Sequence, residues 1–224
     1  MPSAFISGKL FLTVKFLTIM ETLAFKDAMG ALSLVLMVLA YGIYLWQTVR
    51  EDGVRPHPFS WFLWGFVTGV VYLVQVSQGA GAGSWVVGFT AVICFLVGGV
   101  SFFKDKWRFS FFDWFCLAAG LAVFAFYLLS KNPIQSAILA TITDVIGYGS
   151  TVKKGWAHPH KDSVSSFALN SAKFVPSLFA LQSYSLATWL YPSTLVVMNA
   201  GVAFMLLARR AQMNPVAKAE TQNP

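Results

Sequence analysis

The sequence predicts an all-α polytopic membrane protein with seven transmembrane helices in a 3+1+3 arrangement of two parallel triple-helix bundles. Three observations predict this fold: an apolar composition, seven long hydrophobic runs, and a pattern that occurs twice along the chain. Of the 224 residues, 57% are hydrophobic and 11% are charged, and the mean hydropathy is +0.64. A soluble domain of this size cannot bury so much apolar surface, whereas a bilayer accepts it. The runs also lack the apolar-polar alternation of a transmembrane β-barrel.

Seven runs have the length that a spanning helix needs, which is about 20 apolar residues. They are 28–48, 59–78, 84–103, 110–130, 134–153, 164–182 and 187–208. We therefore expect one membrane domain over 28–209. It divides into a first repeat at about 28–104, a linker helix at about 110–130 and a second repeat at about 134–209.

The two ends of the chain lie outside this domain. Residues 1–27 hold an apolar stretch interrupted by two lysines, and they lack the clean small-residue cleavage site of a signal peptide. An interfacial amphipathic helix fits this segment better, and a translation start at Met20 or Met29 is the alternative. Residues 210–224 are polar and are predicted to form a disordered cytoplasmic tail.

The repeated pattern indicates a duplication. Gln47-Thr48-Val49-Arg50 ends the first span, and Ser150-Thr151-Val152-Lys153 ends the fifth. A His-Pro loop and a serine follow each signature: His57-Pro58 with Ser60, and His158-Pro159 with Ser165. Because one linker helix separates the halves, both halves have the same orientation in the membrane, which is a plan that transporters use.

Basic residues define the topology. Eleven Lys and Arg residues lie on the side of the repeated loops, and four lie on the other side or in the N-terminal segment. By the positive-inside rule, the rich side and the C-terminus are cytoplasmic and the N-terminus is outside. The net charge of +7 then reflects topology and contact with lipid headgroups, not nucleic acid. The chain is short and has no eukaryotic targeting signal, so we expect a bacterial cytoplasmic membrane. Homo-oligomerisation is left open.

One face of the second span is both aromatic and polar. Trp61, Trp64, Thr68, Tyr72 and Gln75 lie three or four residues apart and form a helical stripe. Such a face suits a flat polar ligand, and Trp64 and Tyr72 would then contact the substrate. Alternatively, Trp61 and Gln75 belong to the interfacial belts at opposite ends of the helix.

Two charged residues lie inside predicted spans, Asp144 in the fifth and Lys173 in the sixth. A lone charge in lipid is costly, so the two either pair or face a water-filled cavity. Burial disfavours the ionised form of a carboxyl group, which makes Asp144 a candidate proton or cation site. The alternatives are a structural ion pair between the two spans, or a Lys173 that extends to the interface.

Other residues have simpler interpretations. Gly147, Gly149 and Pro176 permit helix bending and, with Gln47, are candidate hinge or gate residues. Asp113 is expected to cap the N-terminus of the linker helix. The histidines lie in loops without a carboxylate or thiol cluster, so no metal or other cofactor is expected. The sequence shows no nucleophile-base pair of the kind that enzymes use, so we do not expect an enzyme.

These features resemble the PQ-loop superfamily, which includes the SWEET and SemiSWEET sugar transporters. The resemblance covers about 40–209. It rests on the helix plan, the topology, the basic loop after the first helix of each repeat, and Asn199 in the last span. In that family this Asn lines the substrate pocket together with an aromatic residue of the repeat's second helix. By position, the resemblance implies these substrate-contacting residues: Tyr72, Thr90, Ser177 and Asn199.

The chain departs from the family pattern at several of these positions. The Pro-Gln pair is replaced by Trp46-Gln47 and Gly149-Ser150, and the first-repeat Asn is Thr90. The resemblance implies a transporter of a small polar solute (a sugar, amino acid or organic acid) that works by alternating access, with Asp144 as a proton site. The alternative is a non-transporting membrane receptor or assembly factor on the same scaffold.

Overall fold

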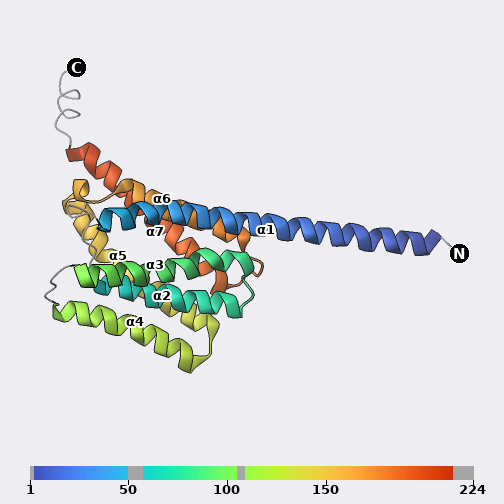
Figure 1. Cartoon of the computed structure of the whole chain (residues 1–224), viewed down its shortest axis with the longest axis horizontal. Helices are drawn as coiled ribbons and strands as arrows, with labels where there is room; N and C mark the ends of the chain where they lie inside the picture. Colours follow the sequence, from blue (N-terminus) through green and yellow to red (C-terminus); the bar gives the residue numbers. More distant parts are fainter. Residues whose placement is uncertain (1–2, 50–57, 105–108, 214–224) are drawn as a thin grey trace, which may run out of the picture.

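The computed structural model describes residues 3–49, 58–104 and 109–213, and every element within them is helical (Figure 1). The elements in chain order are α1 (Ser3–Val49), α2 (Pro58–Ser77), η1 (Gly81–Ser84), α3 (Trp85–Lys104), α4 (Phe111–Ser130), α5 (Pro133–Ala157), η2 (Pro159–Lys161), α6 (Val164–Ala180) and α7 (Leu186–Met213). The prediction of an all-α fold with seven long helices is confirmed.

Five helical segments of the described residues are long and apolar enough to cross a membrane: Thr18–Trp46, Pro58–Ser77, Gly81–Phe103, Asp113–Ser130 and Leu186–Met213. The predicted spans 134–153 and 164–182 form α5 and α6, which are not among the five. The 17 residues of α6 fall short of the usual spanning length. Both helices also carry several polar residues, which lowers their mean hydropathy.

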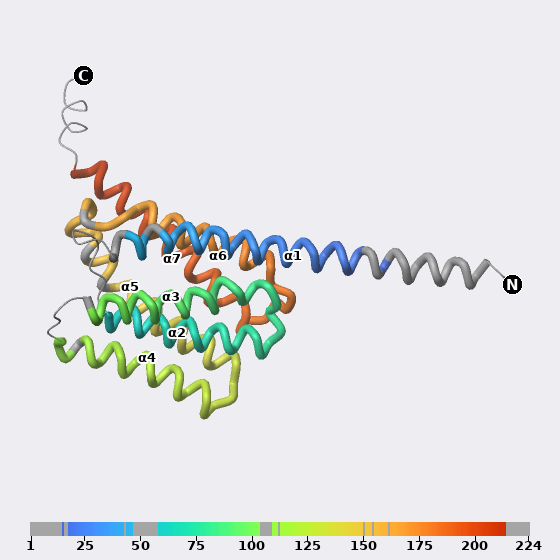
Figure 2. Tube along the Cα trace, in the orientation of Figure 1, coloured from blue at the N-terminus to red at the C-terminus, as the bar shows by residue number. Residues whose placement is uncertain are grey.

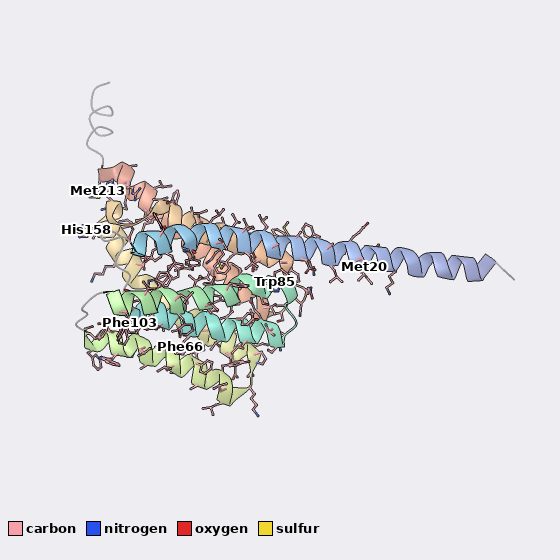
Figure 3. All side chains as sticks on the ribbon, viewed as in Figure 1. Met20, Phe66, Trp85, Phe103, His158 and Met213 are labelled. Carbon is pink, nitrogen blue, oxygen red and sulfur yellow. The ribbon has the colours of Figure 1, made fainter. Side chains whose placement is uncertain are left out.

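The N-terminal segment differs from its expected form. The sequence separates an interfacial helix in 1–27 from a span at 28–48, whereas α1 runs from Ser3 to Val49 without a break. The labelled Met20 lies on the part of α1 that extends beyond the bundle (Figure 3). No glycine or proline lies between residues 9 and 29 to interrupt the helix, so its hydrogen bonding continues.

The helices pack in a regular order. α3 contacts both α1 and α2, and α7 contacts both α5 and α6. Between the halves, α1 packs on α6 and α2 packs on α5, while α4 packs against α2 and α5 at the edge of the bundle (Figure 2). Trp85 marks one end of this bundle, the η1 end, and His158 marks the other, the His158 end (Figure 3).

Two local features explain how these helices are held. Six valines of α2 and α3 have 0% exposure and belong to one core cluster: Val67, Val70, Val71, Val74, Val86 and Val87. At the start of α4, the Ser110 backbone N–H donates to Asp113 Oδ2 (2.7 Å) and the Asp113 N–H donates to Ser110 Oγ (3.3 Å). This is a capping box, which confirms the predicted capping role of Asp113.

Candidate functional site

Lys173 is buried in the middle of the bundle, on α6. Its exposed fraction is 0%, and its Nζ donates to Tyr41 Oη on α1 (3.0 Å) and to Thr90 Oγ1 on α3 (3.2 Å). The same Nζ lies 4.1 Å from the centre of the Tyr41 ring and 4.8 Å from that of Phe174. Uncharged oxygens and ring faces therefore replace the water that an ammonium group loses on burial.

Asp144 is the buried acid, near the middle of α5. Its exposed fraction is 3%, and Oδ2 has no hydrogen-bond partner among the described residues. No ion pair within 4.0 Å joins it to Lys173. The direct structural ion pair that the sequence left open is therefore not formed, and Lys173 does not extend to an interface. Both ionisable side chains are therefore buried in the bundle without pairing with each other.

Further polar side chains are buried in the same bundle. Tyr41, Cys94 and Tyr191 belong to the same cluster of buried residues as Phe174, the chain neighbour of Lys173, and Tyr148 packs against this cluster. We call this set the polar core: Tyr41, Thr90, Cys94, Asp144, Tyr148, Lys173, Tyr191 and Asn199. It draws on α1, α3, α5, α6 and α7, and therefore on both halves of the chain.

The structure brings together some predicted site residues. Thr90 binds Lys173 directly. Asn199 on α7 is 3% exposed, donates from Nδ2 to the Leu195 carbonyl (2.9 Å), and lies beside Tyr148. Thr90 and Asn199, which the resemblance pairs as repeat equivalents, thus belong to the same polar core as the two charges.

The other predicted substrate residues pack against neighbouring helices. A Cβ built on Gly88 would lie 2.7 Å from Tyr72 Cδ2, so the Tyr72 ring covers α3 at this glycine. Trp64 Nε1 would lie 3.7 Å from a Cβ on Gly147 of α5. Ser177 is fully buried and donates to the Gly83 carbonyl of η1 (2.8 Å). In this conformation these three side chains fill interfaces between helices.

The aromatic and polar stripe of α2 faces inward. Trp61 is 8% exposed and Gln75 is 0% exposed, so neither has the exposure of a lipid-interface belt residue. Gln75 Nε2 donates to the Thr188 carbonyl of α7 (2.7 Å). The Trp61 ring packs 5.0 Å from the Tyr44 ring and 5.4 Å from the Trp64 ring, measured between centroids. The stripe therefore joins α2 to α1 and α7.

The predicted hinge positions lie within continuous helices. Gly147 and Gly149 are inside α5, and Pro176 is buried inside α6. Gln47 belongs to the last turns of α1, although its side chain lies outside the described part of the structure. The first repeated loop, with His57, also lies outside the described residues.

At the η1 end, the two halves meet closely. Besides the Ser177 bond, the Gln182 N–H donates to the Ala80 carbonyl (3.0 Å). A Cβ on Gly83 would lie 2.8 Å from the Leu181 nitrogen, so only glycine permits this approach. We call η1 with Ser177, Leu181 and Gln182 the η1 lock. It joins the α2–α3 connection of the first half to the end of α6 in the second.

At the His158 end, α7 holds the α5–α6 connection. Arg210 donates from Nε to the Pro159 carbonyl (3.1 Å) and from Nη2 to the Asp162 carbonyl (2.6 Å). Arg209 lies over the Trp156 ring, 4.4 Å from its centre. These contacts stay within the second half and make α5, η2, α6 and α7 one unit.

Sequence reasoning missed four members of the polar core: Tyr41, Cys94, Tyr148 and Tyr191. A signal for Tyr41 exists in the repeat. Tyr41 precedes Gln47 by 47 − 41 = 6 residues, and Asp144 precedes Ser150 by 150 − 144 = 6 residues. In the repeat that the sequence predicts, the two residues occupy equivalent positions. Cysteine and tyrosine are common in apolar helices, so the sequence contains no comparable signal for Cys94, Tyr148 and Tyr191.

Comparison of the chain with protein-family models, curated proteins and solved structures found no match. The class of the protein therefore rests on its own structure. Several long apolar helices, packed around buried polar groups, fit an integral α-helical membrane protein.

Proposed function

We propose that this chain is a membrane transporter that moves a small polar solute by alternating access, with two triple-helix bundles in a 3+1+3 arrangement. The helix packing supports this arrangement. α3 lies between α1 and α2 as α7 lies between α5 and α6, and α1 meets α6 as α5 meets α2. Two equivalent bundles then face each other, with α4 as the linker helix, which is similar to the PQ-loop superfamily.

The observation that carries the transport proposal is the polar core. Lys173 and Asp144 lie near the middles of α6 and α5, where a membrane protein keeps buried charges chiefly for function. Thr90 accepts a hydrogen bond from Lys173, and Asn199 is buried on α7; each belongs to the third helix of a proposed bundle. The solute contacts Thr90 and Asn199, and Asp144 takes a proton or a charged group of the solute. When the bundles rock against each other, Trp64, Tyr72 and Ser177 also come into contact with the solute.

Alternating access gives the η1 lock a role. The lock holds the two bundles together at the η1 end. The basic residues at the other end support an extracellular position for the lock. Its hydrogen bonds then break when the site opens outward. Bending at Gly147, Gly149, Pro176 and Gln47 allows each bundle to move. The proposed setting is a bacterial cytoplasmic membrane with the C-terminus inside.

We expect Asp144→Asn and Asn199→Ala each to lower solute uptake at least tenfold in proteoliposomes, and Asp144→Asn to remove any stimulation by a proton gradient. The first change removes the titratable group, and the second removes an amide from the polar core. Uptake of labelled glucose, lactate and an amino-acid mixture is the measurement.

Thr143→Ala is the matched control on α5, because its hydroxyl donates to the Leu139 carbonyl of its own helix (2.9 Å). Unchanged uptake in both site variants would rule out the proposed site.

A second candidate function is a non-transporting receptor or assembly factor. The burial of both charges, 0% for Lys173 and 3% for Asp144, favours it. We expect that a transporter lets water reach the polar core in at least one state. Single cysteines at positions 144 and 199, with Cys94 and Cys116 replaced by alanine, report this by reaction with a charged thiol reagent. Absence of labelling from both membrane faces, together with absence of uptake, selects the receptor.

A further inference from the structure

We propose that a cavity at the η1 end binds the phosphate of an anionic phospholipid whose headgroup carries no ammonium group. The cavity lies where the end of α2, the end of α4 and the start of α5 meet (Figure 1). Its volume is about 340 Å³, and small-molecule sites range over about 300–1,000 Å³. The cavity shares no residue with the polar core, so the proposal does not depend on the transport function. Six described residues line it: Ser77, Gln78, Tyr127, Leu128, Lys131 and Pro133.

The depth of the cavity matches the headgroup layer of a membrane. Two of the candidate spans end at Ser77 and at Ser130. Gln78 and Lys131 directly follow these ends, where the hydrocarbon of a bilayer gives way to polar headgroups. Leu129 precedes them on α4 and is exposed, so it offers an apolar surface to an acyl chain. A lipid therefore reaches the cavity with its headgroup at the right height.

The lining offers hydrogen-bond donors to an anion. Gln78, Tyr127 and Lys131 carry an amide, a hydroxyl and an ammonium group, and none of these side chains forms a hydrogen bond or ion pair with another described residue. Phosphate oxygens accept hydrogen bonds, and those from an ammonium group are the stronger ones. No Asp or Glu belongs to the described lining, so the ammonium group of a zwitterionic headgroup would find no counter-charge there. Phosphatidylglycerol, with one phosphate and neutral hydroxyl groups, has the headgroup chemistry that fits this lining.

The backbone at Lys131 supports a role for its ammonium group. Lys131 ends α4 with a φ of 50°, and it is the one described residue other than glycine with a positive φ. Helices that end in this left-handed conformation usually carry glycine there, because a Cβ crowds the neighbouring carbonyl. The chain thus has lysine where glycine suits the backbone better, and this lysine is the only cation of the described lining.

A lipid in this cavity connects the two halves of the chain through the linker helix. α4 packs against α2 of the first half and against α5 of the second. All three helices contribute to the lining, because Gln78 follows α2, Lys131 ends α4 and Pro133 begins α5. A ligand that binds only the folded chain stabilises it, so the lipid should raise the thermal unfolding midpoint.

Titration of the full chain with phosphatidylglycerol tests the site. In phosphatidylcholine nanodiscs with a rising fraction of phosphatidylglycerol, the unfolding midpoint of the wild type should rise and then saturate. Lys131→Gly should need a roughly tenfold higher fraction for half of the rise, because it loses a hydrogen bond to a charged group. In phosphatidylcholine alone, this variant should unfold at an equal or higher temperature, because glycine suits the positive φ. Tyr127→Phe removes only a hydroxyl and should weaken the titration in the same direction.

Two control variants and one soluble probe separate this site from general charge effects. Lys131→Arg keeps the cation and should keep the wild-type titration. Lys26→Met removes a lysine of α1 that does not line the cavity, so its titration should also match the wild type. Inorganic phosphate added to phosphatidylcholine nanodiscs should produce no rise. A rise with inorganic phosphate equal to that with phosphatidylglycerol would overturn the lipid assignment, and equal titrations of Lys131→Gly and Lys26→Met would overturn the site itself.

Discussion

Lys173→Met should reduce solute uptake by roughly a hundredfold while the bundle stays folded. Methionine has a similar length and packs against Phe174, but it has no charge and no donor for Tyr41 and Thr90. Truncating one partner of a buried charged hydrogen-bond pair typically costs about 2–5 kcal/mol. About 2.7 kcal/mol corresponds to a hundredfold change in rate. Initial uptake rates in proteoliposomes and the thermal unfolding midpoint of the purified chain are the two measurements.

Two further variants separate the role of the buried ammonium group from general effects. Tyr41→Phe keeps the ring 4.1 Å from Nζ and removes only the hydroxyl. A hydrogen bond to a charged group contributes about 1.5–3 kcal/mol, so we expect roughly a tenfold loss. Lys153→Met removes an exposed lysine near the His158 end of α5 and should leave uptake unchanged. If Lys173→Met behaves like Lys153→Met, the polar core does not bind the solute.

Much of the helical framework follows from the length of the hydrophobic runs and from the proline, glycine and capping residues at their ends. The predicted span 59–78 differs by one residue at each end from Pro58–Ser77, and 84–103 differs equally little from Trp85–Lys104. A proline starts α2, and a glycine-rich segment separates it from α3. The capping role of Asp113 was likewise predictable, because a capping box needs only the local spacing from Ser110.

The polar core was only partly predictable. Asp144 and Lys173 stood out because charges are rare within apolar runs. Their partners did not, because the contact of Lys173 with Tyr41 joins residues 132 positions apart. Which side chain of α1 faces α6 depends on the rotation and approach of both helices. Hydrophobic periodicity does not specify these quantities when most faces of a helix are apolar.

The predicted hinge and substrate roles remain predictions for a related reason. Ser177 was assigned to a substrate pocket from its position in the repeat, and it binds the Gly83 carbonyl. The close approach of η1 to α6 that makes this bond depends on three-dimensional packing. A glycine in a short connection carries little information about the neighbour that it will meet.

Gly83→Ala is the second change with a large expected effect, because it acts on the η1 lock. The new Cβ would lie 2.6 Å from Leu181 Cδ2, 2.8 Å from the Leu181 nitrogen and 2.9 Å from Leu181 Cα. A side chain can rotate away, but the backbone of Leu181 can retreat only if η1 separates from α6. Overpacking costs about 1–3 kcal/mol, and loss of the Ser177 bond adds about 1 kcal/mol. The thermal unfolding midpoint should therefore fall.

Gly69→Ala is the matched control, because a Cβ on Gly69 of α2 meets nothing within 4 Å. Alanine is favoured over glycine inside a helix by about 1 kcal/mol, so this variant should unfold at the same or a higher temperature. A single cysteine at Ala82, which is 2% exposed, reports opening of the lock and should react faster in the Gly83→Ala background. Equal midpoints and equal labelling in the two backgrounds would mean that steric closeness at η1 does not hold the bundles together. Closure at the η1 end would then have to come from the Gln75–Thr188 contact and the packing of α1 on α6.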